Sequence, residues 1–430
     1  AFFLENTYPI LHFPDWETLP YDVFSPLPEI ISQRLKTLVA LQHNRRGALV
    51  VSVATLMQRL APREHVLAHS FSLKIGGQFN LELTRIKLES VGYQCVSQVY
   101  QHGEFAVRGA IVDLFPMGSD VPYRIELFDE DIESIRTFDP ETQMSLEKIS
   151  EIQLFPAREF PFTDASIKHF RQAFREQFPQ ASAKNNLYVD VSKRIAFGGI
   201  EYYFPLFVEH TESLFDYLPA STVLVLPESF AQNASLFYTE AEERFEQRKY
   251  DIERPLLKPQ QLFLTTSELT QRVEKFSQIV CATTTAILLE DRKSFECVEF
   301  QSLKLPDLSI DTRLKQSAHK LQEFLTQFSG RVLLVAETAG HREGLIDKLK
   351  LYQLQAKQVS SWTQFLESSD RLCMVVAPIE HGLWLQNPAL VIISENLLSG
   401  EKSQQRRRQR RAGLKELENI VNNLTELTIG

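Results

Sequence analysis

Residues 104–139 read EFAVRGAIVDLFPMGSDVPYRIELFDEDIESIRTFD and decide how this part of the chain folds. Side chains alternate between the two faces of a strand, and residues 123–128 follow that period of two. One face carries Tyr123, Ile125 and Leu127, which suit a core. The other face carries Arg124, Glu126 and Phe128. The segment predicts strands joined by tight turns, with an aromatic ring on the face where polar residues normally lie.

The outward face of this predicted sheet has two interpretations. The preceding strand, residues 105–108, turns Phe105 and Val107 inward and Arg108 outward. An aromatic ring beside arginines is typical of binding hot spots, which favours a docking surface. A half-buried sheet with ordinary surface charges predicts the same alternation, because exposed arginines are common. The alternation by itself leaves both interpretations open.

The composition bounds the class of protein. A chain of 430 residues is expected to form about three domains. Its net charge of −9 argues against a chain that coats nucleic acid nonspecifically. The four cysteines are scattered, which predicts free thiols in a reducing cytosol rather than a zinc site or disulfides. No apolar run reaches a membrane span, and the first residues, AFFLENTYPI, lack the charged start of a signal peptide. The abrupt apolar start suggests a chain cut within a domain.

The order of apolar runs predicts an α/β frame interrupted by an α+β module. The frame is expected to contain a helix that begins at Pro28 and strands at 9–13, 48–53, 222–226, 261–265 and 278–282. Asp164 is expected to cap a further helix. The runs at 48–53 and 222–226 predict strands buried on both faces. An exposed connector is expected at 303–313. A second α/β unit follows, with strands 331–336, 372–377 and 390–394, and then a charged stretch and a helix at 414–424.

A search for catalytic chemistry finds no complete motif. No G-x-x-x-x-G-K-[ST] phosphate loop occurs, and Ser399–Ser403 has Glu401 in place of its second glycine. Glu395 follows a predicted strand without an acidic partner. The dense carboxylates between Asp113 and Glu133 are expected to be solvated charges rather than a metal site. The run Arg406–Arg411 predicts either a solvated linker or a site for phosphate or an acidic protein face.

Three landmarks carry a family resemblance. The first comprises VRGAIVDLFP at 107–116, RIELF at 124–128 and DIESI at 131–135. The second is PDWETLPYD at 14–22, and the third is GIEYYFPLF at 199–207. In this order they resemble the excision-repair protein UvrB, and more closely the amino-terminal region of the bacterial transcription-repair coupling factors, the Mfd family.

The resemblance implies a domain plan. It predicts a RecA-like, UvrB-like parallel-sheet domain split into residues 1–69 and 157–302, with a UvrA-binding α+β domain inserted at 70–156. Residues 303–400 would form a further small α/β domain of unknown role. Residues 401–430 would be a charged linker and helix before the polymerase-binding domain.

The resemblance also implies the function and the site. The chain is expected to be an adaptor that recruits UvrA to RNA polymerase stalled at DNA lesions, with Arg108, Arg124 and Phe128 binding UvrA and Glu126 orienting Arg124. Each guanidinium is expected to pair with UvrA carboxylates, and Arg124→Ala or Phe128→Ala to leave the melting temperature nearly unchanged. No catalytic, metal or nucleotide-binding residue and no cofactor is expected within the chain.

Other expectations concern the intact family protein in the cytoplasm. An ATP-dependent double-stranded DNA translocase and the polymerase-binding domain would lie beyond this chain, and a carboxy-terminal domain would mask the UvrA surface. Two alternatives stay open. One is a UvrB-like ATPase whose phosphate loop precedes the first residue here. The other is a nucleic-acid-binding module that uses Arg406–Arg411.

Overall fold

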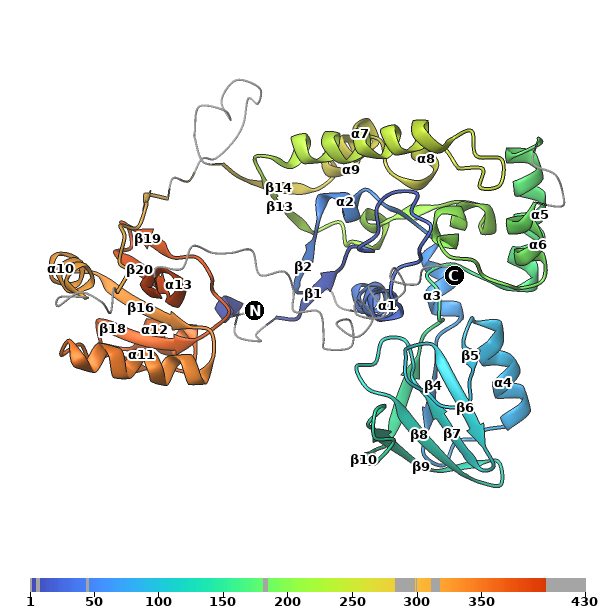
Figure 1. Cartoon of the computed structure of the whole chain (residues 1–430), viewed down its shortest axis with the longest axis horizontal. Helices are drawn as coiled ribbons and strands as arrows, with labels where there is room; N and C mark the ends of the chain where they lie inside the picture. Colours follow the sequence, from blue (N-terminus) through green and yellow to red (C-terminus); the bar gives the residue numbers. More distant parts are fainter. Residues whose placement is uncertain are drawn as a thin grey trace, which may run out of the picture. The chain divides into compact units, whose positions relative to one another are not determined.

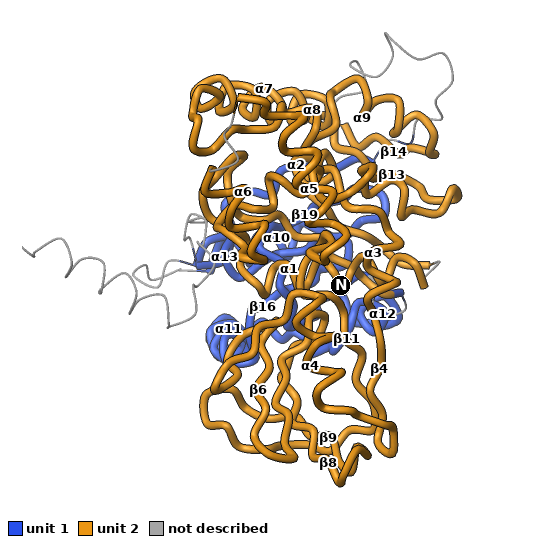
Figure 2. The backbone as a smooth tube through the Cα atoms, turned by 90° about the vertical axis from the view of Figure 1, so that its right-hand side faces the viewer, with its two compact units in different colours: residues 1–8, 294–430 blue, residues 9–293 orange. Residues whose placement is uncertain are grey.

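The computed structural model describes residues 2–4, 8–43, 46–180, 185–282, 298, 300–310 and 318–399. The chain divides into two compact units, one of residues 9–293 and one of residues 1–8 with 294–430 (Figure 2). The predicted helix at 414–424 and the run Arg406–Arg411 lie outside the described residues. No helix in the described ranges is long and apolar enough to cross a bilayer.

The larger unit consists of a frame, residues 9–70 and 157–282, and an inserted domain, residues 71–156 (Figure 1). The frame contains β1 (Ile10–Phe13), α1 (Pro28–His43), β2 (Ala48–Val51), α2 (Val53–Leu56), β3 (Arg59–Leu60), α3 (Arg63–Ala68), α5 (Asp164–Gln177), α6 (Asn186–Ser192), η2 (Ile200–Phe207), β12 (Glu212–Ser213), η3 (Leu214–Tyr217), β13 (Val223–Pro227), α7 (Phe230–Arg248), α8 (Pro259–Leu262), α9 (Thr266–Val273) and β14 (Ser277–Cys281).

The parallel strands of the frame form small sheets. β1 pairs with β2, and β13 pairs with β14, each as a separate two-stranded parallel sheet. The predicted burial of both strand faces is therefore wrong for β2 and β13. Val50 is 54% exposed and Val225 is 64% exposed, because each sheet packs on the core through one face only. Leu224 and Leu226 on the other face of β13 join the core of the frame.

Three smaller expectations for the frame and the following unit are also wrong. The predicted strand at 261–265 begins instead within helix α8, where Pro259 occupies the first turn and suits a helix start. Thr163, not Asp164, caps α5, because its hydroxyl accepts from the backbone N–H of Ser166. The segment at 303–313 is not an exposed connector throughout, since Leu308 is 1% exposed and packs in the core of the smaller unit.

The inserted domain is a twisted sheet covered on its inner face by one helix. It contains β4 (Phe71–Lys74), α4 (Leu81–Ser90), β5 (Gln94–Cys95), β6 (Glu104–Arg108), β7 (Ile111–Leu114), β8 (Tyr123–Phe128), β9 (Asp131–Phe138), β10 (Ser145–Ile149) and β11 (Glu151–Leu154). The six-stranded sheet has the order β10-β9-β8-β7-β6-β5, antiparallel except for β5 with β6, and β4 pairs with β11 in a separate two-stranded antiparallel sheet. Leu88 of α4 packs against Ile125 and Ile135 of the sheet.

The smaller unit is a second α/β layer structure. It contains η1 (Phe2–Leu4), β15 (Ser302–Leu303), α10 (His319–Gln327), β16 (Arg331–Ala336), α11 (Ala339–Leu351), β17 (Lys357–Gln358), α12 (Trp362–Glu367), β18 (Leu372–Val376), β19 (Leu383–Leu385), β20 (Leu390–Ser394) and α13 (Glu395–Ser399). Its sheet has the order β15-β19-β20-β16-β18-β17, with β20, β16, β18 and β17 parallel. Apolar clusters cover both faces, which confirms the predicted α/β arrangement.

Candidate partner-docking surface

The predicted docking residues lie on two strands, Arg124 and Phe128 on β8 and Arg108 on β6. Ile125 and Leu127 point into the core, while Phe128 at the end of the strand is 74% exposed. The alternation predicted for this strand is confirmed. On β6, Phe105 is buried and Arg108 is exposed at the hairpin to β7. Gly109 has φ of +63° in that hairpin, a conformation that glycine adopts without steric cost.

Arg124 is held within its own domain rather than free. Its Nε donates to Asp113 Oδ1 at 2.7 Å, and its Nη2 donates to Asp113 Oδ2 at 3.0 Å. Its Nη1 donates to the carbonyl oxygen of Gln143 at 3.1 Å and to Ser145 Oγ at 3.2 Å. The side chain is only 15% exposed, and its guanidinium lies over the Phe138 ring at 5.0 Å. The hydrogen bonds to Asp113 raise the pKa of Arg124.

Asp113 is the residue that sequence reasoning misjudged. It was expected to be a solvated charge, but its side chain is fully buried. Arg108 Nη2 also donates to Asp113 Oδ2, so one carboxylate holds two arginines from neighbouring strands. A signal was present in the sequence. Asp113 and Arg124 are oppositely charged residues on consecutive predicted strands. In the structure they are direct partners across β7 and β8, so their side chains share a face.

Glu126 bonds to the neighbouring strand, and its role in orienting Arg124 stays a prediction. Its carboxylate accepts a hydrogen bond from Ser134 Oγ at 2.5 Å, across β8 and β9. Among the described contacts, the carboxylate that orients Arg124 directly is that of Asp113. Because Arg124 is paired and largely buried, the expectation that Arg124→Ala leaves the melting temperature unchanged no longer fits its environment.

The corner that carries Phe128 is tied down by backbone hydrogen bonds. Gly76 N–H donates to the Ile132 carbonyl at 2.8 Å, Ile132 N–H donates to the Gly77 carbonyl at 3.0 Å, and Phe79 N–H donates to the Glu130 carbonyl at 2.6 Å. These bonds link the β8–β9 turn to the segment before α4. The exposed ring therefore stands on a rigid support, which lowers the entropy that a partner would have to remove on binding.

The other two sequence landmarks pack against each other inside the frame. Trp16 lies edge-on to Tyr202 with ring centroids 5.5 Å apart, and Thr18 Oγ1 lies 3.0 Å from the Tyr202 hydroxyl. Tyr202 also donates to the Leu19 carbonyl at 2.7 Å. Both landmarks belong to one hydrophobic cluster, so their aromatic residues build the core of the frame.

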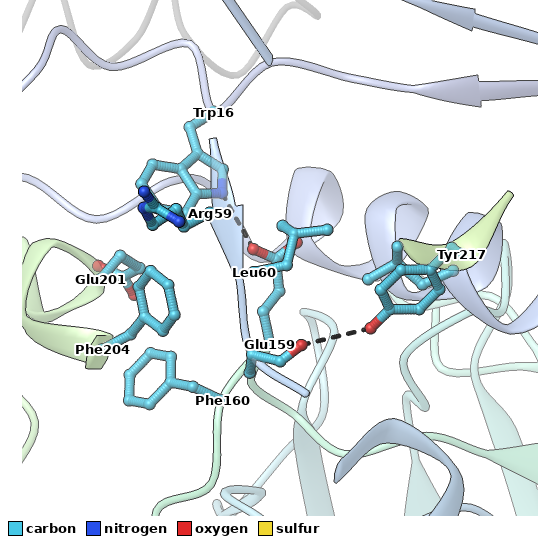
Figure 3. A pocket seen from close by; sticks show the side chains of 10 residues that line it. Trp16, Arg59, Leu60, Glu159, Phe160, Glu201, Phe204 and Tyr217 are labelled. Atoms are coloured by element: carbon cyan, nitrogen blue, oxygen red, sulfur yellow. Dashed lines mark hydrogen bonds between the residues drawn. The ribbon is translucent and has the colours of Figure 1, made fainter. Parts of the chain in front are cut away.

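A small cavity lies at this junction (Figure 3). Trp16, Glu159, Phe160 and Phe204 line it, and the Trp16 indole N–H donates to Glu159 Oε2 at 3.1 Å. Its volume is about 10 Å³, which is room for about one water molecule and too little for a nucleotide. Within the described residues, no group of three or more His, Cys, Asp or Glu side chains is arranged to hold a metal ion.

Comparisons with known proteins agree with the landmarks. Residues 71–160 match the model of the UvrB interaction domain, and residues 324–398 match the model of the MFD D3 domain. A transcription-repair-coupling factor of Haemophilus influenzae is 41% identical over 97% of this chain and 36% of its own length. The one from Escherichia coli is 38% identical over 98% of this chain, also 36% of its own length.

This chain is a relative of the transcription-repair-coupling factors. A third such factor, from Rickettsia prowazekii, is 31% identical over 65% of the chain and 25% of its own length. The family resemblance inferred from the sequence landmarks is thereby confirmed. The chain spans about a third of the length of its first two curated relatives.

Removing the carboxylate that holds both arginines is expected to loosen the sheet locally. In Asp113→Ala, Arg124 loses its bidentate partner in a mostly buried position. We expect the free energy of unfolding to fall by about 3 kcal/mol, the lower end for a broken buried ion pair. The lower end applies because the second arginine, Arg108, reaches water. Hydrogen exchange of the amides in β7 and β8 of the whole chain measures the change.

The matched control is Asp120→Ala. Its carboxylate is 88% exposed and pairs with Lys36 on the surface, so exchange in β7 and β8 is expected to stay as in the parent. Equal protection in Asp113→Ala and Asp120→Ala would show that the two arginines do not depend on Asp113.

Proposed function

We propose that this chain recruits the excision-repair protein UvrA to RNA polymerase stalled at DNA lesions, as part of a cytoplasmic transcription-repair coupling factor. The UvrA-binding face is the outward face of β6, β7 and β8. The remaining length of the intact protein would supply polymerase binding, ATP-driven movement on double-stranded DNA and a carboxy-terminal domain that masks this face. The frame would be a UvrB-like, RecA-like domain that is split by the insertion. Residues 303–400 would form an α/β domain of undefined role.

The exposed ring of Phe128 is the observation that carries this proposal. A phenylalanine that is 74% exposed on a rigid corner buries little in its own domain, whereas aromatic anchors beside arginines dominate binding energy at protein interfaces. The match to the UvrB interaction domain covers the same strands.

The structure refines how the arginines would act. Arg108 has a half-exposed side chain and, among the described residues, uses only Nη2 to hold Asp113. The exposed half of this side chain would pair with a carboxylate of UvrA. Arg124 would hold Asp113, the partner of Arg108, in place, because it donates hydrogen bonds to Asp113 and to the turn before β10. We therefore assign direct contact to Phe128 and Arg108, and positioning to Arg124, with Glu126 steadying β8 through Ser134.

Calorimetric titration of the whole chain with purified UvrA tests the proposal. Arg108→Ala is expected to weaken binding by more than 1 kcal/mol, about fivefold or more, because a charge-assisted pair at the interface is lost. Hydrogen exchange in β6 should change little, since the Arg108 side chain is half exposed.

Arg85→Ala is the matched control. Arg85 is 53% exposed on α4, which covers the opposite face of the sheet, and it pairs with Glu89 on its own helix. Its loss removes the same charge without touching the docking face. If both variants bind UvrA like the parent chain, or if the parent chain does not bind UvrA at all, the proposed function is wrong.

A further inference from the structure

One cross-strand row of the inserted domain concentrates positive charge. Asp113 on β7 faces Arg124 on β8, Arg124 faces Arg136 on β9, and Arg136 faces Lys148 on β10. Direct partners in an antiparallel sheet share a face and bring their side chains together. The row therefore places three cations beside one carboxylate, on the face that also carries Phe128. We call this set of four residues the charged row.

The single carboxylate of the charged row is already committed. Asp113 accepts from Arg124 and from Arg108, and its side chain is fully buried. Arg136 and Lys148 form no ion pair with any residue in the described part of the chain. Arg136 Nε is moreover shielded from water without an acceptor.

This arrangement costs the folded domain free energy. Like charges directly opposite each other in a sheet are destabilising, and a shielded N–H without an acceptor loses its hydrogen bond to water. Places where a chain breaks such local rules are typically functional sites. The charged row also continues the proposed docking face, because Arg124 fixes the Gln143–Ser145 turn that leads into β10.

We propose that Arg136 and Lys148 form a second subsite for an acidic segment of the docked protein. This inference rests on the proposed function, since the segment would belong to UvrA. A carboxylate pairs bidentately with Nη1 and Nη2 of Arg136, since only its Nε is shielded from water, and relieves the repulsion between Arg136 and Arg124. A second carboxylate pairs with Lys148 on the edge strand β10.

The charge pattern favours an acidic peptide over nucleic acid. A phosphate backbone requires a long stripe of cations, because each phosphate carries a charge. On the same face, the next pair along β8 and β9 is Glu126 with Ser134, and exposed Asp131 lies opposite Phe128. These carboxylates interrupt the positive charge, so the face suits a short acidic segment better than a phosphate backbone.

Titration of the whole chain with UvrA tests the subsite. Arg136→Gln is expected to weaken binding about tenfold, and Arg136→Glu with Lys148→Glu about a hundredfold or more, with a reduced dependence on salt. Arg85→Gln removes one charge from α4 on the opposite face and should bind like the parent chain. Hydrogen exchange in β9 is expected to be unchanged in Arg136→Gln, because that variant also removes a like-charge repulsion.

The outcomes separate the subsite from the proposed function. If Phe128→Ala weakens UvrA binding and the two charge variants do not, the subsite is overturned while the docking face stands. If the parent chain does not bind UvrA, a hexaglutamate peptide tests the subsite alone through the nitrogen-15 resonance of the Arg136 side chain. A saturable shift that Lys148→Gln weakens is expected. No shift, or a shift produced by a DNA duplex and not by the peptide, would overturn the inference.

Discussion

Phe128→Ala is expected to weaken the binding of UvrA by about 2 kcal/mol or more, roughly thirtyfold, while leaving the fold intact. The ring is 74% exposed, so its loss removes little apolar burial within the chain. Its support is rigid, because backbone hydrogen bonds tie the β8–β9 turn to residues 76–79. A pre-positioned aromatic anchor contributes strongly to the free energy of binding, because little conformational entropy is lost when it binds.

Calorimetry with UvrA and thermal unfolding of the same variant provide the measurement. Leu83→Ala is the matched control, since Leu83 is 67% exposed on α4, which packs on the opposite face of the sheet. It removes a comparable exposed apolar side chain without touching the docking face, so its affinity for UvrA should equal that of the parent. A variant at Phe128 that lost stability and affinity together would show that the ring is structural.

Arg34→Ala is expected to destabilise the larger unit by about 3–5 kcal/mol, the usual cost of removing one member of a buried ion pair. The Arg34 side chain is fully buried, and its Nε donates to Glu159 Oε1 at 2.5 Å. Nη1 donates to the Pro14 carbonyl at 2.7 Å, and the guanidinium lies 4.0 Å from the centre of the Phe13 ring. Without Arg34, the Glu159 carboxylate would remain in the interior with the Trp16 indole as its described donor.

Thermal unfolding of the whole chain, together with hydrogen exchange in α1, reports this loss. Lys36→Ala on the same helix is the control, because its pair with Asp120 is exposed and contributes little. The double variant Arg34→Met with Glu159→Gln should recover much of the stability, since it removes both charges and keeps an acceptor for Trp16. A loss in Arg34→Ala no larger than in Lys36→Ala would contradict the assignment.

This buried pair has a consequence for the docking face. Glu159 lies in the segment that leads from the inserted domain back to the frame, and its neighbour Phe160 packs against Phe207 with ring centroids 5.2 Å apart. Ser32 Oγ of α1 also accepts from the Gly118 N–H at 2.8 Å. The frame thus holds the inserted domain through buried contacts, so a destabilised frame is expected to weaken docking indirectly.

Short-range patterns predicted the elements that depend on them. The period of two in residues 123–128 identified the buried and exposed sides of β8, including the exposed ring of Phe128. The apolar runs at 331–336 and 390–394 identified β16 and β20 with their observed bounds. These predictions hold because alternation and strand length are local properties of the backbone.

The predictions that failed depend on which segments meet in space. The apolar run at 222–226 has the composition of a strand buried on both faces, yet β13 pairs only with β14 and leaves Val225 exposed. Burial is a property of neighbours that lie far apart in the sequence. The same reason explains Leu308, whose segment has the sequence of an exposed connector but which belongs to a buried hydrophobic cluster with residues of α10 and β16.

The sequence by itself determined the family, the alternation of β8 and the presence of an aromatic ring among arginines. Only the tertiary structure decided how those arginines are used, because a single buried carboxylate is brought between two strands by the register of β6, β7 and β8. Register also aligned Arg124, Arg136 and Lys148, which are distant in the sequence but are neighbours across the paired strands. Coulomb interactions act over distance in space, so the charge of this face exists only once the strands have paired.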